Sequence, residues 1–310
     1  MKDKLVTLIG GGGFVGRYVA QELLRRGARV RIAQRDPKRA FFIRPLGGLG
    51  QTQFVAVDVT KADSVARAIA GSDAVINFVG ILKGDFQAIH ATGAGNVAKA
   101  AAAAGVDRLV QISAIGAAAD SPSAYGRSKA AGEAAVQQAF PNATIVRPSL
   151  IFGPEDGLSN LFAGLIRAFP IIPVIAPETK VQPAYVVDIA RAIAEIVADP
   201  ATAGSTFELG GPEILTMRQL NEWIASATRR ERLFVDVPSP VAATMAAFGF
   251  LPGAPITSDQ WNMLKSDNVV SNSAKGFAAL DIAPTPLSAV AEGWLVQYRK
   301  HGRFAGRASA

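Results

Sequence analysis

The sequence predicts a doubly wound α/β fold, in which helices cover both faces of a parallel sheet. Two observations lead to this prediction. A glycine-rich turn joins a short apolar run to a helical pattern, and short β-branched runs then alternate with helical stretches. With 310 residues, of which 49% are hydrophobic and 18% charged, the chain can build one large core or a core with a modest appended domain.

The glycine-rich turn follows the apolar run at residues 5–9 and contains four consecutive glycines, with a fifth three residues later. Gly10 permits a sharp exit from the strand, Gly13 a close approach to a pyrophosphate, and Gly16 tight packing of helix on sheet. The N–H groups and dipole of the following helix favour an anion. The residues expected to cradle a dinucleotide diphosphate are Gly10, Gly13, Phe14, Val15 and Gly16.

Strands and helices alternate along the rest of the first half of the chain. The further predicted strands are residues 29–34, 53–57, 73–79, 108–113 and 143–147. The predicted helices are residues 14–26, one that opens at Thr60–Asp63, 86–104, 125–140 and 189–198, with two later ones opening at Thr216–Gln219 and Thr257–Gln260. This alternation is typical of a Rossmann-type parallel sheet.

The same pattern predicts two domains. We expect a dinucleotide-binding Rossmann domain at residues 1–212 and a smaller C-terminal α/β lobe on the substrate side at 213–310, to which residues 151–175 contribute. Two apolar stretches, 161–173 and 241–251, are too short to span a bilayer. We interpret them first as core, with an apolar substrate pocket or a membrane-facing patch as alternatives.

The net charge of +7 is unevenly distributed. Residues 1–50 hold 11 Lys and Arg against 3 Asp and Glu, and the last 17 residues hold 4 against 0. Solvated helix faces are the ordinary explanation. The alternatives are a phosphate-bearing cofactor near the N-terminal part and an anionic membrane or partner at the tail. Nucleic acid fits poorly, because aromatic residues do not interleave with the basic ones.

Residue usage also restricts the chemistry. The chain has no cysteine and two histidines, His90 and His301, which argues against disulfides, thiolate catalysis and a metal site. The opening apolar run is too short for a signal peptide, which favours a cytoplasmic location.

The end of the second predicted strand indicates which dinucleotide fits. An NAD site would place an Asp or Glu there, whereas this chain has Arg35, followed by Lys38 and Arg39, which can pair with a 2′-phosphate. Asp36 leaves the alternative open, since it could reach the ribose. We therefore predict NADP(H), with NAD(H) as the alternative.

Other predicted cofactor contacts come directly after the third and fourth strands. Asp58 and Val59 lie where an acidic side chain can accept from the adenine amino group, although Asp58 could equally cap the helix at Thr60. The other residues predicted to line the cofactor here are Asn77, Val79 and Gly80. Gly80 leaves room for ribose and diphosphate.

Catalytic chemistry is expected at Tyr125 and Lys129. Their spacing of four places both on one helix face, where Lys129 can lower the pKa of the phenol by charge proximity. Such a tyrosine can act as a general acid or base beside a nicotinamide. An amphipathic helix with an exposed ion is the ordinary alternative.

Several motifs of the chain resemble those of a known family. The motifs are Gly10-x-x-Gly13-Phe14-Val15-Gly16, Tyr125-x-x-x-Lys129, Arg147-Pro148, Phe152-Gly153-Pro154 and Tyr185-Val186-Val187-Asp188. They are similar to those of the extended and atypical short-chain dehydrogenases/reductases. Five further segments, at residues 75–80, 124–133, 139–141, 151–156 and 255–260, resemble the accessory subunit of respiratory complex I that is related to these enzymes, and its bacterial relatives.

This resemblance implies tightly held NADP(H), a structural or regulatory role in the mitochondrial members, and ties to ubiquinone biosynthesis. The family's catalytic Tyr and Lys fall on Tyr125 and Lys129, and Pro148 and Leu150 would lie near the nicotinamide. The catalytic hydroxyl is offered only by Ser113, two residues early, so Ile115 would occupy its place and turnover would be slow or absent.

Two functions follow as hypotheses. The first is an NADP(H)-binding protein associated with respiratory complex I or a quinone-synthesis assembly, with weak or no catalysis and with peripheral contact at the cytoplasmic face of the inner membrane. The second is an NADPH-dependent oxidoreductase or epimerase acting on a hydrophobic, quinone-like or isoprenoid-like substrate, with Tyr125 as proton donor.

Overall fold

The computed structural model describes residues 1–249, 251, 256–300 and 302, in two compact units. The first unit consists of Met1–Pro148, Val186–Leu209 and Ser271–Ala283, and the second of Ser149–Tyr185, Gly210–Val270 and Pro284–Ala310. The sequence predicts a boundary after residue 212, with residues 151–175 contributing to the second domain. In the structure the second unit includes Ser149–Tyr185, and Val186–Leu209 and Ser271–Ala283 belong to the first unit. Pro255 of the resemblance motif, His301 and two basic tail residues, Arg303 and Arg307, lie outside the described residues.

The first unit is built on a seven-stranded parallel sheet, which confirms the predicted fold class. Its order is β11-β6-β5-β4-β1-β2-β3. The strands are β1 (Leu5–Ile9), β2 (Arg29–Gln34), β3 (Thr52–Ala56), β4 (Ala74–Asn77), β5 (Arg108–Ile112), β6 (Thr144–Pro148) and β11 (Thr206–Leu209). The order changes direction between β1 and β4, and ligands of such sheets bind at the carboxyl ends of the strands beside this point.

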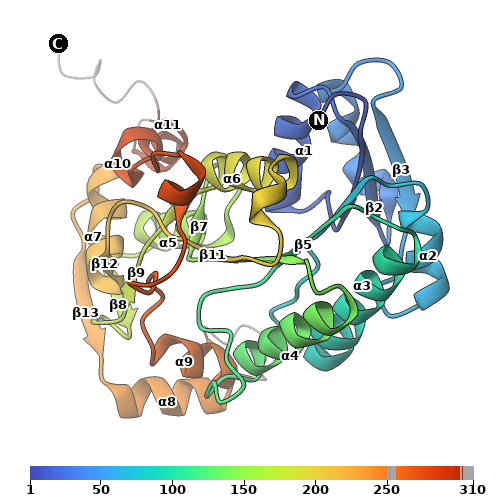
Figure 1. Cartoon of the computed structure of the whole chain (residues 1–310). Helices are drawn as coiled ribbons and strands as arrows, with labels where there is room; N and C mark the ends of the chain where they lie inside the picture. Colours follow the sequence, from blue (N-terminus) through green and yellow to red (C-terminus); the bar gives the residue numbers. More distant parts are fainter. Residues whose placement is uncertain (250, 252–255, 301, 303–310) are drawn as a thin grey trace. The chain divides into compact units, whose positions relative to one another are not determined.

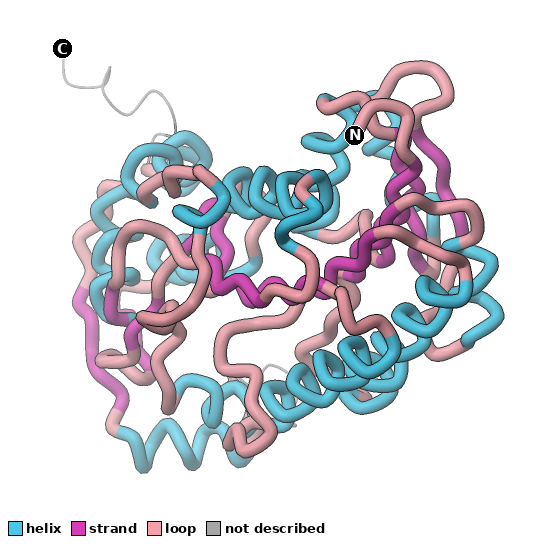
Figure 2. Tube along the Cα trace, in the orientation of Figure 1, coloured by secondary structure: helices cyan, strands magenta, loops and turns pink. Residues whose placement is uncertain are grey.

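Helices cover both faces of this sheet (Figures 1 and 2). α1 (Phe14–Arg25) packs against α6 (Val186–Ala198) on one face, and α2 (Ala62–Ile69), α3 (Ala94–Ala103) and α4 (Ala124–Ala139) follow one another on the other. α1 buries Val19 and Leu23, one turn apart, so the apolar spacing in the sequence becomes its core-facing stripe.

Two predicted helices differ from the structure. The stretch predicted as one helix over residues 86–104 is a π-helix at Gln87–Gly93 that continues as α3. A Cβ at Gly132 of α4 would overlap the carbonyl oxygen of His90, so this glycine lets α4 pack directly on the π-helical backbone. The helix predicted to open at Thr60 begins at Ala62, because Asp58 accepts from both the amide and the hydroxyl of Thr60.

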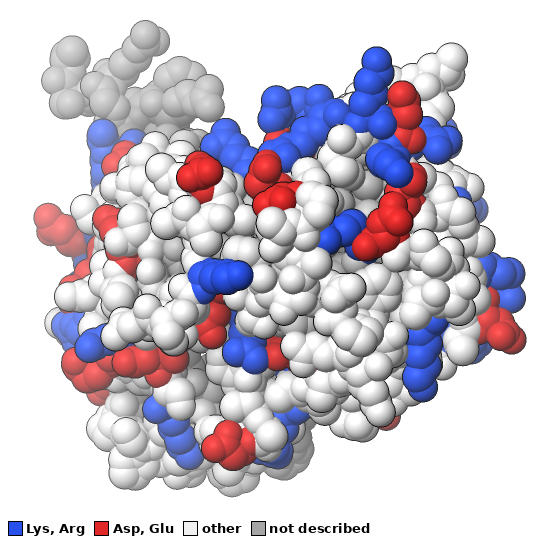
Figure 3. Space-filling view, in the orientation of Figure 1, with Lys and Arg blue, Asp and Glu red and all other residues white. Residues whose placement is uncertain are grey.

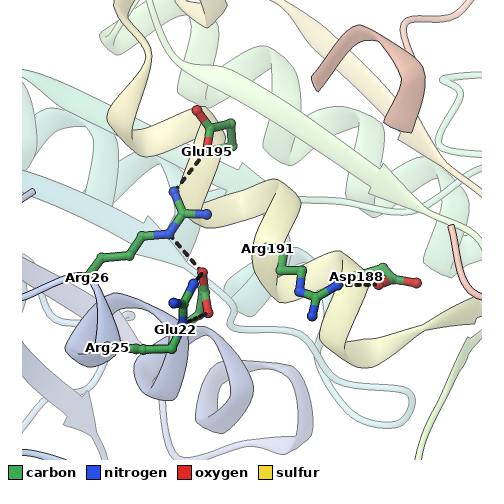
Figure 4. A network of polar contacts seen from close by, with 6 residues as sticks. All are labelled: Glu22, Arg25, Arg26, Asp188, Arg191 and Glu195. Carbon is green, nitrogen blue, oxygen red and sulfur yellow. Dashed lines mark hydrogen bonds and ion pairs between the residues drawn. The ribbon is translucent and has the colours of Figure 1, made fainter. Parts of the chain in front are cut away.

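Ion pairs use part of the positive charge of the N-terminal segment (Figure 4). Glu22 accepts from Arg25 and Arg26 at 2.8 Å each, and these arginines lower its pKa to about 2. Arg26 also reaches Glu195 of α6 at 2.9 Å, which ties the two helices together. Figure 3 shows that Lys and Arg still gather over the N-terminal part of the first unit.

The second unit packs helices around three two-stranded sheets. Its strand pairs are β7 (Ile151–Phe152) with β10 (Ala184–Tyr185), β9 (Lys180–Val181) with β12 (Leu215–Thr216), and β8 (Ile171–Ile175) with β13 (Leu233–Val237). Its helices include α5 (Gly157–Ala168), α7 (Met217–Ala227), α8 (Ser239–Ala247), α9 (Ser258–Leu264), α10 (Leu287–Val290) and α11 (Glu292–Leu295). The capping boxes predicted at Thr216 and Thr257 are both present and open α7 and α9.

The two apolar stretches of this unit are core on one side only. Ala163, Ile166 and Ile172 are buried, but Phe169 and Ile171 are more than half exposed. In the described part of residues 241–251, two alanines of α8 are buried, while Val241, Phe248 and Leu251 are exposed. The prediction of core is therefore wrong for half of each stretch. No helix among the described residues is long and apolar enough to cross a bilayer.

Candidate functional site

The glycine turn has the geometry that its sequence predicts. Gly10 has φ +79°, a conformation that side chains rarely adopt, and a Cβ there would lie 3.2 Å from Val79 Cγ2. A Cβ at Gly16 would lie 2.6 Å from the carbonyl oxygen of Gly11, so helix and turn are in direct backbone contact. Gly13 is exposed. Gly10 is thus required by its backbone conformation and Gly16 by packing, whereas Gly13 leaves the backbone open to a ligand.

The N-terminus of α1 is suited to an anion. Gly13 is the N-cap, and no described side chain caps it, nor does the first turn contain an acidic residue. The first amides of a helix lack intrahelical partners, so those of Phe14, Val15 and Gly16 can donate to a bound phosphate. These are the residues that the sequence predicts to cradle the diphosphate.

Gln34, the last residue of β2, connects this turn to the loop that follows. Its Oε1 accepts from the Gly12 amide at 3.1 Å, and its Nε2 donates to the carbonyl oxygen of Asp36 at 2.6 Å. The motifs of the sequence do not point to Gln34. Its one signal is a polar side chain that follows two apolar residues, Ile32 and Ala33, at the end of the strand.

The loop after β2 separates its acidic residue from its basic ones. The carboxylate of Asp36 accepts from the amide of Lys38 at 3.1 Å and thereby caps a 3₁₀-helix at Pro37–Leu46. Arg35, Lys38 and Arg39 are exposed. Arg35 is near enough to Asp58 to help lower its pKa, after the larger contributions from the hydrogen bonds of Thr60. Arg35 is therefore exposed at the end of β2, while the carboxylate of Asp36 already accepts a hydrogen bond from the protein backbone.

The residues after β3 divide between surface and core. Asp58 is half-buried, and its hydrogen bonds to the amide and hydroxyl of Thr60 both use Oδ1. Val59 is 5% exposed, and its carbonyl accepts from Asn96 at 2.9 Å. Val59 thus supports the loop through packing, and Asp58 is the side chain of the two that reaches the surface.

The residues after β4 have different surroundings. Asn77 is buried, donates to Gln111 of β5 at 2.8 Å and accepts from the amide of Val79 at 3.1 Å, so its side chain braces the sheet. Val79 packs against Gly10. Gly80 is exposed, and a Cβ there would lie 3.4 Å from Lys129 Nζ. Gly80 therefore lies between Val79, which packs on the glycine turn, and Lys129 of the predicted catalytic pair.

Tyr125 and Lys129 lie on one face of α4, as their spacing predicts. The Lys129 ammonium lies 5.9 Å from the centre of the Tyr125 ring and donates to the carbonyl oxygen of Ile112, at the end of β5, at 3.0 Å. His90 and Phe86 complete an aromatic cluster, with the His90 and Tyr125 rings edge to face at 5.4 Å. From the sequence, His90 is considered only as a possible metal ligand, and its place beside Tyr125 is not predicted.

Burial sets the protonation of this cluster. It raises the pKa of Tyr125 to about 12, so the prediction that Lys129 lowers the phenol pKa is wrong for this arrangement. Burial also lowers the pKa of Lys129 to about 8, partly opposed by Glu133. Desolvation, helped by Lys129, lowers the pKa of His90 to about 4. Near neutral pH the phenol keeps its proton, which suits a donor and disfavours a base.

His90 has a defined tautomer. Its Nε2 accepts from the amide of Ile81 at 2.9 Å, so the neutral ring carries its proton on Nδ1 and donates to Ser128 Oγ at 2.8 Å. Ser128 then donates to the carbonyl oxygen of Tyr125 at 2.7 Å. This chain of hydrogen bonds fixes the first turn of α4, where Tyr125 lies.

We expect His90 to remain neutral as the pH falls below its ordinary pKa of 6.5, down to about 4. Because the unfolded chain binds this proton first, the contribution of His90 to stability is complete above 6.5 and is lost towards 4, a change on the order of 3 kcal/mol. Urea unfolding over this range should show a shallower pH dependence in His90→Gln than in the wild type. A His90 NMR signal that titrates at its ordinary pKa would contradict the assignment.

The predicted catalytic hydroxyl is buried, and the two residues predicted to lie near the nicotinamide belong to different units. Ser113 is 4% exposed, and its Oγ has no hydrogen-bond partner within the described part of the chain, while Ile115 is half-buried. Pro148 ends β6 in the first unit and accepts from the amide of Ile115 at 3.2 Å. Leu150 belongs to the second unit, where its amide donates to Asn268 at 3.0 Å.

The comparisons with known proteins agree with this fold and glycine turn. A family model described as NAD(P)H-binding matches residues 10–160. A triphenylmethane reductase from Citrobacter sp., whose crystal structure is complexed with NADP(H), has a TM-score of 0.74 at 19% identity, covering 93% of this chain and 99% of that one. The fold, the glycine turn and the matching family model therefore define a protein with an NAD(P)H-binding domain.

The relatives in sequence are more specific. The mitochondrial NADH dehydrogenase (ubiquinone) 1 alpha subcomplex subunit 9 of Arabidopsis thaliana is 35% identical, covering 96% of this chain and 79% of its own length. A ceramide reductase of Caulobacter vibrioides is 28% identical, over 93% of this chain and 88% of its own length. The chain belongs to the family of the alpha subcomplex subunit 9 proteins.

Proposed function

We propose that this chain binds NADP(H) and that the bound nucleotide mainly stabilises a protein that associates with a respiratory or quinone-synthesis assembly. The observation that carries the choice of NADP(H) over NAD(H) is the loop after β2. Asp36 is engaged as a helix cap, while Arg35 is exposed beside it. An arginine there can pair with a 2′-phosphate, whereas NAD sites use a free acidic side chain for the 2′-hydroxyl.

The nucleotide would lie along the carboxyl ends of the strands. In this proposal Gly10, Gly13 and the first amides of α1 hold the diphosphate, Lys38 and Arg39 assist Arg35, and Asp58 and Val59 border the adenine. The residues of the first unit expected near the nicotinamide and its ribose are Asn77, Val79, Gly80, Lys129 and Pro148.

The association with an assembly rests on the relatives. The Arabidopsis relative is named as a mitochondrial subunit of NADH dehydrogenase (ubiquinone), and we extend that kind of role to this chain. We further propose that it acts from the cytoplasm, at the cytoplasmic face of the inner membrane, as a peripheral component.

Weak catalysis is consistent with the residue expected at the position of the catalytic hydroxyl. The family resemblance assigns Ile115 to that position, and its side chain cannot donate a hydrogen bond. Hydride transfer would then lack a hydrogen-bond donor to the substrate carbonyl.

A second candidate is favoured by the proximity of Gly80, Lys129 and Tyr125. This is an NADPH-dependent oxidoreductase or epimerase for a hydrophobic, quinone-like or isoprenoid-like substrate, with Tyr125 donating the proton and Lys129 orienting the ribose. The ceramide reductase relative supports this candidate weakly.

One experiment separates the two candidates. The purified protein should carry NADP(H), which mass spectrometry of the released nucleotide would identify, and Tyr125→Phe should keep that nucleotide. If the role is structural, Tyr125→Phe complements a deletion strain as well as the wild type does. Lost complementation with retained nucleotide would instead establish the oxidoreductase, and absence of any bound or titratable dinucleotide would contradict both.

A further inference from the structure

We propose that the outer face of the β8–β13 sheet, together with three arginines at its end, binds the surface of a bilayer that contains anionic phospholipids. The proposal rests on the proposed function, in which the protein acts at the inner membrane, and it identifies the surface that would contact that membrane. Its residues lie entirely in the second unit, and none of them belongs to the nucleotide site.

The sheet has one covered and one bare face. Ile172 and Val174 of β8 are buried in the core of the second unit, so their neighbours in the strand point outward. The parallel register pairs Ile171 with Leu233 and Pro173 with Val235. The outward side chains therefore form one continuous patch, which we call the apolar strip and which consists of Phe169, Ile171, Pro173, Leu233 and Val235.

The apolar strip is strongly exposed. Leu233 is 61% exposed, Phe169 54% and Ile171 53%. Isolated exposed apolar residues are normal, but a contiguous patch on a regular sheet indicates a binding surface. In Figure 1, β13 and β8 lie side by side, and α8 continues from the end of β13.

An arginine cluster, made of Arg167, Arg230 and Arg232, lies at the start of both strands. Arg232 precedes Leu233 and donates to the carbonyl oxygen of Ile166 at 2.6 Å. Arg230 is close enough to Arg232 and Arg167 that burial and these two charges lower its pKa.

Within the part of the chain that the structure describes, no carboxylate forms a recorded ion pair with this cluster. Among the described residues, the recorded partners of the three arginines are backbone carbonyls and the ring of Tyr298, which lies under Arg167 at 5.5 Å. Glu231 is the acidic residue within the same turn, and it is exposed. The cluster is therefore available to an anionic partner at the end of the apolar strip.

This combination fits a membrane surface better than a protein. A stable protein interface buries about 800 Å² on each partner, more than five side chains supply. A bilayer surface requires only a few inserted apolar or aromatic groups and basic residues that meet anionic headgroups. The strip would enter the headgroup region while the arginines contact lipid phosphates.

The test is flotation of the full chain with vesicles of phosphatidylcholine and phosphatidylglycerol, compared with phosphatidylcholine alone. The protein should bind the mixed vesicles, and high salt should release it. Ile171→Ser with Leu233→Ser should weaken binding by about tenfold or more. Arg167→Gln with Arg230→Gln should weaken it by about fivefold for each arginine, equivalent to about 1 kcal/mol.

The matched control is Leu49→Ser, which removes an apolar side chain that is fully exposed in the first unit. It should leave vesicle binding unchanged, and Arg35→Ala should do so as well, which separates this proposal from the nucleotide site. Binding to neither vesicle type, equal binding to both, or loss in Leu49→Ser instead would overturn the proposal. Self-association through the strip, lost in the serine pair without any vesicle binding, would also overturn it.

Discussion

Replacing Gly16 with alanine is expected to destabilise the protein by about 2–3 kcal/mol and to abolish nucleotide binding. The added Cβ would lie 2.6 Å from the carbonyl oxygen of Gly11 and 2.7 Å from its carbonyl carbon and Cα. These are backbone atoms of the turn, so no side chain can move to make room. α1 would have to shift away from the turn, which displaces the amides that face the diphosphate. Urea unfolding and an NADPH titration measure the two effects.

Gly164 of α5 provides the matched control. No described heavy atom lies within 4 Å of a Cβ built at Gly164, so Gly164→Ala should stabilise the protein by about 0.5–1 kcal/mol. Glycine-to-alanine substitution is thus expected to lower the free energy of unfolding at Gly16 and to raise it at Gly164. Unchanged stability and NADPH affinity in Gly16→Ala would contradict the role assigned to the turn.

Replacing Arg35 with alanine is expected to lower the affinity for NADPH by about ten- to hundredfold and to leave the affinity for NADH unchanged. The loss corresponds to about 1.5–3 kcal/mol for a hydrogen bond to a charged group. Arg35 is exposed and is not a recorded structural hydrogen-bond donor among the described residues, so the fold should not change. Fluorescence titration with both nucleotides measures the effect.

Arg67→Ala on α2 is the control, because it removes an equally exposed arginine of the same unit. It should alter neither affinity. Equal affinity of the wild type for NADPH and NADH would show that Arg35 does not select the cofactor. A parallel loss of both affinities in Arg35→Ala would show that the loop holds the dinucleotide without reading its phosphate.

The glycine turn and the pair Tyr125–Lys129 could be predicted because each depends on spacing within one strand or helix. The same holds for the capping boxes at Thr216 and Thr257, which the structure reproduces. Local rules of this kind need no knowledge of distant parts of the chain.

His90 and the pKa of Tyr125 could not be predicted in this way. His90 meets Tyr125 because a π-helical turn packs on α4, an event that depends on Gly132, 42 residues along the chain. The phenol pKa depends on how deeply the assembled cluster excludes water, which spacing does not specify. The apolar stretches failed for a similar reason, since apolar content does not tell which face another element covers.

Gln34 has a consequence for selectivity. Because one side chain holds both the Gly12 amide and the backbone of Asp36, the glycine turn and the loop after β2 are ordered together when the chain folds. If NADP(H) binds as we propose, little conformational entropy remains to be lost at either the diphosphate or the 2′-phosphate. The proposed site for the adenosine half is then a preorganised unit whose two parts Gln34 joins.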